Sequence, residues 1–293
     1  MAFGPARYVR QAENLSLSLR RHMPGIVLAI ITDARSVEGF DHIVPVNSLR
    51  WGLGVSQKIF LDEYTPFQET LYLDADCLAT RSFHAELEAL RNFSFTTAGH
   101  SYLPPSTCYK GAASLAATLG ALALSRIPVF NGGLYFFRRD PASRELFDLA
   151  RDLLRRWHEL GLKRFDQAGP NEETVFGLAI EKLGLPLKSG GGRLMKTPVG
   201  IIGPLEIDPL GGGTRFNKAG KIVEPAICHF SGKHWTWPEY RICERLLRGQ
   251  PAGAFVRLRF RAGHLAAGAV GRARPIVDRL LMKLRCRLKF RKN

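Results

Sequence analysis

The sequence lacks a hydrophobic run long enough to cross a bilayer. Its longest weakly polar stretch, residues 111–125, has 15 residues, whereas a membrane-spanning helix needs about 20 predominantly apolar ones. The opening segment, MAFGPARYVRQAENLS, also lacks the apolar core of a secretory signal peptide. We therefore expect a soluble cytoplasmic protein.

Cysteine is scarce as well. The chain has five cysteines, an odd number, and none of them forms a CxxC pair. This spacing argues against a disulfide framework and against a zinc ribbon, and it favours a reducing compartment.

Acidic residues are few relative to basic ones. Asp and Glu number 26 against 42 Lys and Arg, which makes the formal net charge +16. A surplus of this kind is typical of proteins that bind nucleic acid, anionic membranes or phosphorylated substrates. The surplus is uneven, because residues 255–293 carry 12 Lys and Arg but a single acidic residue, Asp278.

The basic segment 255–293 contains a helical pattern. Apolar residues share one face while Lys and Arg occupy the other; the apolar positions are Ile276, Val277, Leu280, Leu281, Leu284 and Leu288. A basic amphipathic helix typically lies in an anionic membrane interface. The alternative is a helix that packs on a folded domain and leaves its cationic face in solvent.

Residues 1–250 alternate between apolar runs and helical patterns, which predicts an α/β domain with a mixed, mainly parallel sheet. We predict strands at 26–31, 41–46, 70–73, 93–98 and 129–138, the last interrupted by Asn131-Gly132-Gly133. We predict helices at 8–22, 56–64, 83–91, 142–160 and 172–183. Residues 99–128 are expected to hold either a packed amphipathic helix or an apolar acceptor groove.

Asp74-Ala75-Asp76 is the first candidate for chemistry. Residues i and i+2 of an extended segment point to the same side, so both carboxylates can converge on one hard cation. The pair follows an apolar strand, at the sheet edge where α/β proteins bind ligands. A metal site and a solvated turn remain equally good interpretations at this point.

Three further motifs are candidates. His229 precedes Gly232 and Lys233 in ICHFSGKHW, where glycine permits close backbone approach and lysine suits a phosphate; a core histidine is the simpler interpretation. For Asn131-Gly132-Gly133, a β-bulge or tight turn is the simpler interpretation of the two glycines alone. Glu172-Glu173 can equally serve a helix dipole.

The order of these motifs resembles that of the family-8 glycosyltransferases of the GT-A fold, such as glycogenin-like and bacterial lipopolysaccharide enzymes. The resemblance rests on KIF, TLYLDADCLATRSF, VFNGGLYFFRR, NEETVFGLAIEKLG and ICHFSGKHW, and it spans roughly residues 1–240. It implies a retaining transferase that moves a hexose from a nucleotide-diphospho-sugar, with UDP favoured, to a glycan or lipid-linked acceptor.

The resemblance also implies a set of site residues. The metal ligands for Mn²⁺ or Mg²⁺ would be Asp74, Asp76 and His229, and the residues near the reacting sugar would be Asn131, Glu172 and Glu173. The donor-binding residues would be Ala2, Phe3, Lys58, Asp74, Ala75, Asp76, Asn131, Gly132, Gly133, Gly232 and Lys233. A bound divalent cation and Lys233 would neutralise the diphosphate leaving group.

Family-8 lipopolysaccharide enzymes often end in basic segments, so the resemblance also implies a protein held peripherally at the inner face of the membrane by residues 255–293. Two alternatives remain. One is a nucleic-acid- or polyanion-binding protein that uses the basic segment, although no RRM, KH or helix-turn-helix pattern appears and we expect no nucleic-acid partner. The other is an inactive GT-A scaffold, against which the intact Asp74, Asp76, His229 and Lys233 set argues.

Overall fold

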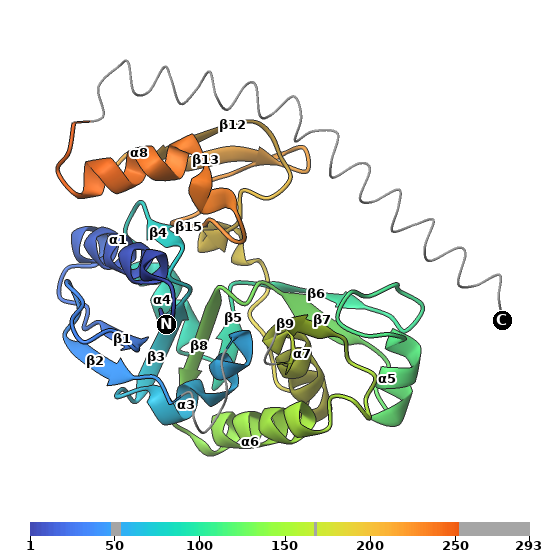
Figure 1. Ribbon diagram of the computed structural model, residues 1–293. Coiled ribbons are helices and arrows are strands. Elements are labelled where there is room, and N and C mark those ends of the chain that lie inside the picture. The colour runs from blue at the N-terminus through green and yellow to red at the C-terminus, as the bar shows by residue number, and fades with distance from the viewer. Residues whose placement is uncertain (48–53, 167–168, 252–293) are drawn as a thin grey trace.

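The computed structural model describes residues 1–47, 54–166 and 169–251 (Figure 1). The predicted amphipathic helix in residues 255–293 lies outside these ranges. Within them, no helix is both long enough and apolar enough to cross a membrane.

The first half of the chain alternates helices with short strands. Its elements are α1 (Ala6–His22), β1 (Ala29–Thr32), β2 (His42–Pro45), the 3-10 helix η1 (Val55–Phe60), α3 (Leu61–Tyr64), β3 (Glu69–Leu73), β4 (Cys77–Ala79), α4 (His84–Leu90), β5 (Phe95–Thr97), β6 (His100–Leu103), α5 (Leu115–Ala121) and β7 (Ile127–Phe130).

The second half adds two long helices and an antiparallel meander. Its elements are β8 (Leu134–Arg138), α6 (Pro141–Arg155), β9 (Arg164–Asp166), β10 (Gly169–Pro170), α7 (Glu172–Leu183), η2 (Gly191–Arg193), β11 (Met195–Lys196), β12 (Ile201–Asp208), β13 (Gly213–Lys218), β14 (Lys221–Val223), β15 (Ile227–His229), η3 (His234–Thr236) and α8 (Pro238–Leu247).

Strand β8 lies at the centre of the molecule, between β3 and β5. Its sequence, LYFFR, is apolar on both faces because both are covered. Tyr135 and Phe137 point into a core shared with α6 and α7, whereas Leu134 and Phe136 point into a second core shared with α1 and α4. The result is a sheet between two helical layers (Figure 1).

The core on the α6–α7 side is rich in aromatic rings. Phe95 and Tyr135 from the sheet meet Phe147 of α6 and Phe176 of α7, with ring centroids 5.1–6.0 Å apart. All four rings are buried, and aromatic pairs at these separations stabilise beyond their burial alone. The helix carrying Phe147 begins at a defined point, because the Asp140 carboxylate accepts a hydrogen bond from the Ser143 N–H at 2.9 Å.

Two strand registers bring distant motifs together. In the antiparallel pair β3–β8, Leu73 lies opposite Leu134. In the antiparallel pair β4–β15, Cys77 lies opposite His229. The segments that flank these residues, 74–76, 131–133 and 230–233, therefore meet where the sheet β3–β8–β5 borders the sheet β11–β15–β4.

The sheet differs from the sequence prediction in strand direction. Only β1–β2 and β11–β15 pair in parallel among the described strands, and the other pairings are antiparallel. The expectation of a mainly parallel sheet is therefore wrong, although the sheet is mixed. The reason is that β8 runs antiparallel to both β3 and β5, and a pattern of apolar runs does not encode the direction of such long-range pairing.

Several predicted boundaries also change. The strand predicted over 129–138 is two strands, β7 and β8, that belong to different sheets. The helix predicted over 56–64 is a 3-10 helix continued by one α-helical turn. Within 99–128, α5 is a packed amphipathic helix whose buried residues include Leu115 and Leu119, and this confirms the simpler of the two expectations for that segment.

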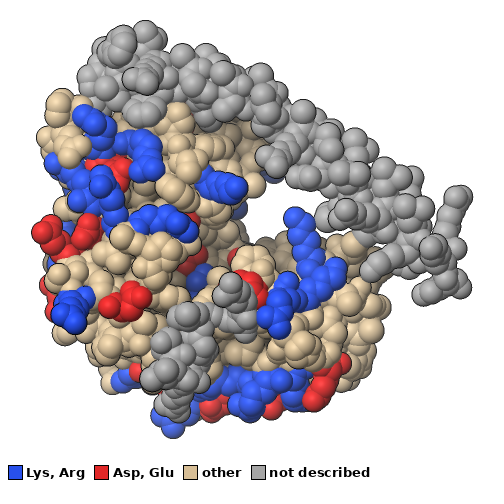
Figure 2. All heavy atoms as spheres, in the orientation of Figure 1, with Lys and Arg blue, Asp and Glu red and all other residues tan. Residues whose placement is uncertain are grey.

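The meander β12–β13–β14 and α8 form the upper part of the molecule in Figure 1. Leu205 and Phe216 of the meander pack with Phe230, Tyr240 and Cys243 in a small core. Figure 2 shows a hollow between this upper part and the body that carries α6 and α7. Because β15 belongs to the sheet β11–β15–β4, His229 is held between the upper part and the body.

Candidate active site

Asp74-Ala75-Asp76 forms the turn that joins β3 to β4. The Asp74 N–H donates to the Gly133 carbonyl at 3.0 Å, which extends the β3–β8 ladder by one residue. The Cys77 N–H donates to the Asp74 carbonyl at 3.0 Å and closes the turn. Ala75 is buried against Ala2, Ala12 and Ile30, and this packing holds the turn in place. The carboxylates of Asp74 and Asp76 both lie near His229.

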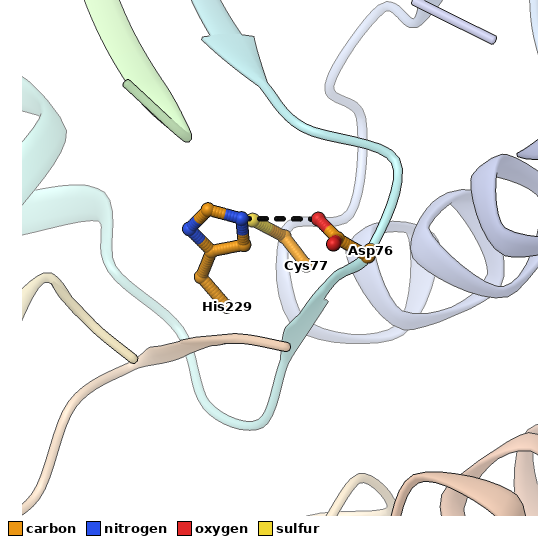
Figure 3. A group of neighbouring side chains, drawn as sticks. All are labelled: Asp76, Cys77 and His229. Atoms are coloured by element: carbon orange, nitrogen blue, oxygen red, sulfur yellow. Dashed lines mark ion pairs between the residues drawn. The ribbon is translucent and has the colours of Figure 1, made fainter. Parts of the chain in front are cut away.

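His229 meets both carboxylates. Its Nε2 lies 3.1 Å from Asp76 Oδ1 and 3.6 Å from Asp74 Oδ2. Figure 3 shows the ring nitrogen and the Asp76 carboxylate pointing toward each other. Burial acts to lower the pKa of His229, but the hydrogen bond to Asp76 and the charges of both aspartates raise it overall.

Cys77 lies beside this pair, and its ligand atom and those of Asp76 and His229 are within 4.8 Å of one another. Burial, followed by the Asp76 charge, raises the pKa of the Cys77 thiol well above its usual value. Its Sγ donates to the Gly133 carbonyl at 3.8 Å. Because only the thiolate is a good metal ligand, the two carboxylates and the imidazole are the better donor set.

Asn131-Gly132-Gly133 lies against His229. The Asn131 Oδ1 is 2.7 Å from His229 Nδ1 and accepts a hydrogen bond from the Gly133 N–H at 2.9 Å. A Cβ atom on Gly133 would lie 2.3 Å from His229 Nδ1, and one on Gly132 would lie 2.7 Å from Glu172 Oε1. Both glycines are therefore required by close approach of the backbone to the site.

Lys58 is buried at the other side of Asp74. Its Nζ lies 2.8 Å from Asp74 Oδ1 and 2.8 Å from Glu172 Oε1, and it donates to the Gly132 carbonyl at 3.0 Å. Tyr72 completes the arrangement by donating its hydroxyl to Asp74 Oδ1 at 2.7 Å. Three sequence-distant acceptors thus share one ammonium group.

The charges of this network stabilise one another. Burial acts to lower the pKa of Lys58, but Asp74 and Glu172 outweigh it and hold the pKa well above its usual value. Burial acts to raise the pKa of Asp74, whereas Lys58 and His229 lower it overall. Lys58 is therefore a permanent cation and Asp74 a permanent anion at neutral pH.

The two glutamates at the start of α7 have different surroundings. Burial raises the pKa of Glu172 to about 7 against the opposing effect of Lys58. Burial also raises the pKa of Glu173, and the hydrogen bond that its Oε1 accepts from the Gly132 N–H opposes this effect. Glu173 is further oriented by the cap of α7, since its N–H donates to Asn171 Oδ1 at 2.7 Å.

The remaining predicted donor residues belong to two other segments of the chain, 2–3 and 232–233. Gly232 has a φ of +68°, and Lys233 is exposed, with no ion-pair partner among the described residues. Ala2 is buried, and its N–H donates to the Ile31 carbonyl at 2.8 Å in a parallel bridge beside β1. Phe3 follows it and is half-buried.

Sequence reasoning missed two tyrosines of the site, Tyr72 and Tyr135. Both tyrosines belong to strands predicted as apolar runs. The alternation of side chains along a strand is the signal that could have placed each tyrosine on one particular face of β3 or β8. The Tyr135 hydroxyl is buried with no hydrogen-bond partner among the described residues, and a Cβ atom on Gly132 would lie 2.6 Å from it. Asn171 was missed as well, although its position before a helix is typical of an N-cap.

No family model matches the sequence, and no curated protein sequence matches it. Solved structures do match, and they place the chain in the GT-A class of nucleotide-diphospho-sugar transferase folds, which confirms the predicted fold class. The likeness is one of fold, because sequence identity is only 14%.

The similar structures include the galactosyltransferase LgtC in complex with donor and acceptor sugar analogs. It has a TM-score of 0.51 and covers 84% of this chain and 94% of its own. An active-site mutant of LgtC, in which glutamate replaces a glutamine, matches with a TM-score of 0.50, 14% identity and the same coverage. The glycosyltransferase GlyE of Streptococcus pneumoniae TIGR4 has a TM-score of 0.40 and 15% identity over 64% of this chain and 43% of its own, which is too weak to add to the fold assignment.

Proposed function

We propose that this chain is a metal-dependent, retaining glycosyltransferase that moves a hexose from a nucleotide-diphospho-sugar to a glycan or lipid-linked acceptor. The observation that carries the proposal is the meeting of Asp76, His229, Asp74 and Lys58 at the junction of the sheets β3–β8–β5 and β11–β15–β4 in a GT-A fold. Buried charged groups gathered at a sheet edge are typical of a functional site.

The donor set fits a divalent cation. His229 Nε2 lies 3.1 Å from Asp76 Oδ1 and 3.6 Å from Asp74 Oδ2, so two carboxylates face one imidazole. Mixed oxygen and nitrogen ligands suit Mn²⁺, with Mg²⁺ as the alternative. When bound, the ion supplies Lewis-acid neutralisation of the diphosphate leaving group.

Lys233 and Gly232 would contact the diphosphate. The Lys233 ammonium is exposed and is not engaged in an ion pair within the described ranges, so it is available to a phosphate oxygen. Gly232 carries no side chain to hinder that approach, and a Cβ there would meet nothing within 4 Å, so its positive φ of +68° is the reason for glycine. Ala2 and Phe3 are the proposed contacts for the base; Ala2 is buried and Phe3 is half-buried.

The residues near the sugar would hold and orient it rather than form a covalent bond. Glu172 is 3% exposed and paired with Lys58, so its carboxylate is engaged by the lysine and is not presented to solvent as a nucleophile. Glu173 and Asn131 surround the Gly132 and Gly133 amides. We infer same-face substitution in which a donor phosphate oxygen takes the acceptor proton.

LgtC is described with donor and acceptor sugar analogs, and this supports a nucleotide-sugar donor and a glycan acceptor here. A UDP-hexose is the proposed donor. The test is a hydrolysis screen with Mn²⁺ across UDP-, GDP- and dTDP-sugars, with Asp76→Asn as the matched control. We expect turnover with a UDP-hexose that requires Mn²⁺ and that Asp76→Asn abolishes. Absence of both turnover and metal-dependent donor binding with every sugar would overturn the proposal.

The second part of the proposal concerns residues 255–293, which we propose to bind the anionic inner surface of a membrane. Their charge in the sequence, 12 Lys and Arg against one Asp, supports this assignment. Removing residues 255–293 should abolish co-sedimentation with vesicles containing phosphatidylserine and leave donor hydrolysis intact. Full sedimentation of the truncated protein would contradict the membrane assignment.

A further inference from the structure

Asn131 accepts two hydrogen bonds that together determine where the proton of His229 lies. Its Oδ1 lies 2.9 Å from the Gly133 nitrogen and 2.7 Å from His229 Nδ1. A backbone N–H can only donate, so the side-chain atom that faces it must be the amide oxygen and not the amide nitrogen. An amide oxygen can only accept, and the proton in the contact with His229 must therefore be on Nδ1.

The opposite side of the imidazole faces negative charge. In the protonated ring Nε2 donates to Asp76 Oδ1 at 3.1 Å; once that proton is lost, the neutral ring keeps its proton on Nδ1 and presents the Nε2 lone pair to Asp76 Oδ1 and to Asp74 Oδ2, which is 3.6 Å away. Two carboxylate oxygens then face the lone pair of Nε2. Because all three groups offer electron pairs, a bound cation stabilises them, whereas another hydrogen-bond acceptor would not.

Gly133 allows the His229 ring to lie close to Asn131. A Cβ atom on Gly133 would lie 2.3 Å from His229 Nδ1, 2.4 Å from Cε1 and 2.8 Å from Asn131 Oδ1. Only a glycine lets the ring edge lie against the backbone and within reach of the Asn131 oxygen. His229 is 4% exposed, so water has little access to compete for Nδ1.

We propose that Asn131 is a positioning residue that selects the Nδ1–H tautomer of His229 and so directs the Nε2 lone pair at the cation. This inference rests on the proposed metal dependence of the enzyme and deepens it. It gives Asn131 a role that is distinct from a direct contact with the sugar.

Nitrogen NMR of the metal-free full chain, with ¹⁵N-labelled histidine, tests the tautomer directly. The His229 signals are identified by their loss in His229→Gln, and spectra are recorded at a pH where the ring is neutral. We expect a protonated Nδ1 in the wild-type protein and in Asn131→Asp, which keeps the oxygen acceptor. In Asn131→Ala we expect protonation to move, at least in part, to Nε2. A protonated Nε2 in the wild type, or an unchanged tautomer in Asn131→Ala, would overturn the inference.

Binding of Mn²⁺, followed by the EPR signal of the free ion, supplies the second measurement. We expect Asn131→Ala to weaken Mn²⁺ binding about tenfold to hundredfold, the usual effect of removing the partner of a ligating histidine. Asn131→Asp should bind close to the wild-type level. Asn217→Ala, which changes an asparagine on β13, serves as the control and should not alter affinity.

The two measurements separate the possible failures. If the wild-type protein binds no Mn²⁺, the proposed metal dependence is wrong, whereas the NMR experiment still decides the tautomer. If Mn²⁺ binds equally well to wild type and Asn131→Ala, the positioning role is wrong and the metal site stands. The wild-type spectrum needs no substitution, so the inference is testable even if Asn131→Ala does not fold.

Discussion

The protonation of Glu172 should make the stability of this protein fall as the pH rises. Its side chain is buried, and burial raises its pKa to about 7 from a usual value of 4.5, against the opposing effect of Lys58. The folded state therefore holds a proton that the unfolded chain releases between about pH 4.5 and pH 7. Because the folded state binds more protons in this window, the free energy of unfolding decreases with pH across it.

The size of the effect follows from the two pKa values. Their difference corresponds to about 3 kcal/mol, which is fully expressed above pH 7 and absent below about pH 4.5. Glu172→Gln keeps the shape and a carbonyl oxygen for Lys58 but cannot ionise. We therefore expect this variant to be within about 1 kcal/mol of the wild type at pH 5 and to be more stable than the wild type by about 3 kcal/mol at pH 8.

Urea denaturation of both proteins between pH 5 and pH 8 measures this difference. The control is Glu88→Gln, because the Glu88 side chain is 62% exposed on α4 and its replacement should change stability by less than about 0.5 kcal/mol at any pH. If Glu172→Gln follows the wild-type curve in parallel, Glu172 does not titrate in this range. If it is less stable at pH 8, the pair with Lys58 outweighs burial. Either result would refute the reasoning.

Three further predictions concern single contacts. Lys58→Met should lower the free energy of unfolding by about 3–5 kcal/mol at pH 8, because it leaves Glu172 buried without a counterion; chemical denaturation measures this, and a loss under about 1 kcal/mol would argue against the pair. Gly133→Ala should weaken Mn²⁺ binding at least tenfold, since its Cβ would lie 2.3 Å from His229 Nδ1, and unchanged EPR titrations would contradict the close approach. Asp140→Ala should cost about 1 kcal/mol through loss of the α6 cap. Thermal unfolding tests that cost, and a variant as stable as the wild type would show that the cap is unimportant.

The site motifs were recognisable from the sequence because their chemistry is local. Asp74-x-Asp76 after an apolar strand, and His229 followed by Gly232 and Lys233, each place functional groups within a few residues of one another. The glycines of Asn131-Gly132-Gly133 were equally visible. The reason that Gly132 and Gly133 must lack a Cβ was not visible, because the atoms that a Cβ would meet belong to Glu172 and His229, which lie far away in the sequence.

The Lys58 network could not be derived in the same way. Lys58 belongs to a short 3-10 helix, and its partners Asp74, Glu172 and the Gly132 carbonyl come from three other segments. No spacing rule connects such residues, and a lysine in a helical pattern is ordinarily read as solvent-exposed. The same limit applies to strand direction, since the prediction of a mainly parallel sheet was wrong where β8 turns back beside β3 and β5.

The sequence by itself determined the α/β class, the position of most helices, the uneven distribution of charge and the residue types available for metal and phosphate. These features depend on periodicity and composition, which are properties of neighbouring residues. The tertiary structure alone decided that Leu73 lies opposite Leu134 and Cys77 opposite His229. Those two registers bring three motifs to the junction of two sheets, and they arise from long-range strand pairing and burial, which no single segment of the chain encodes.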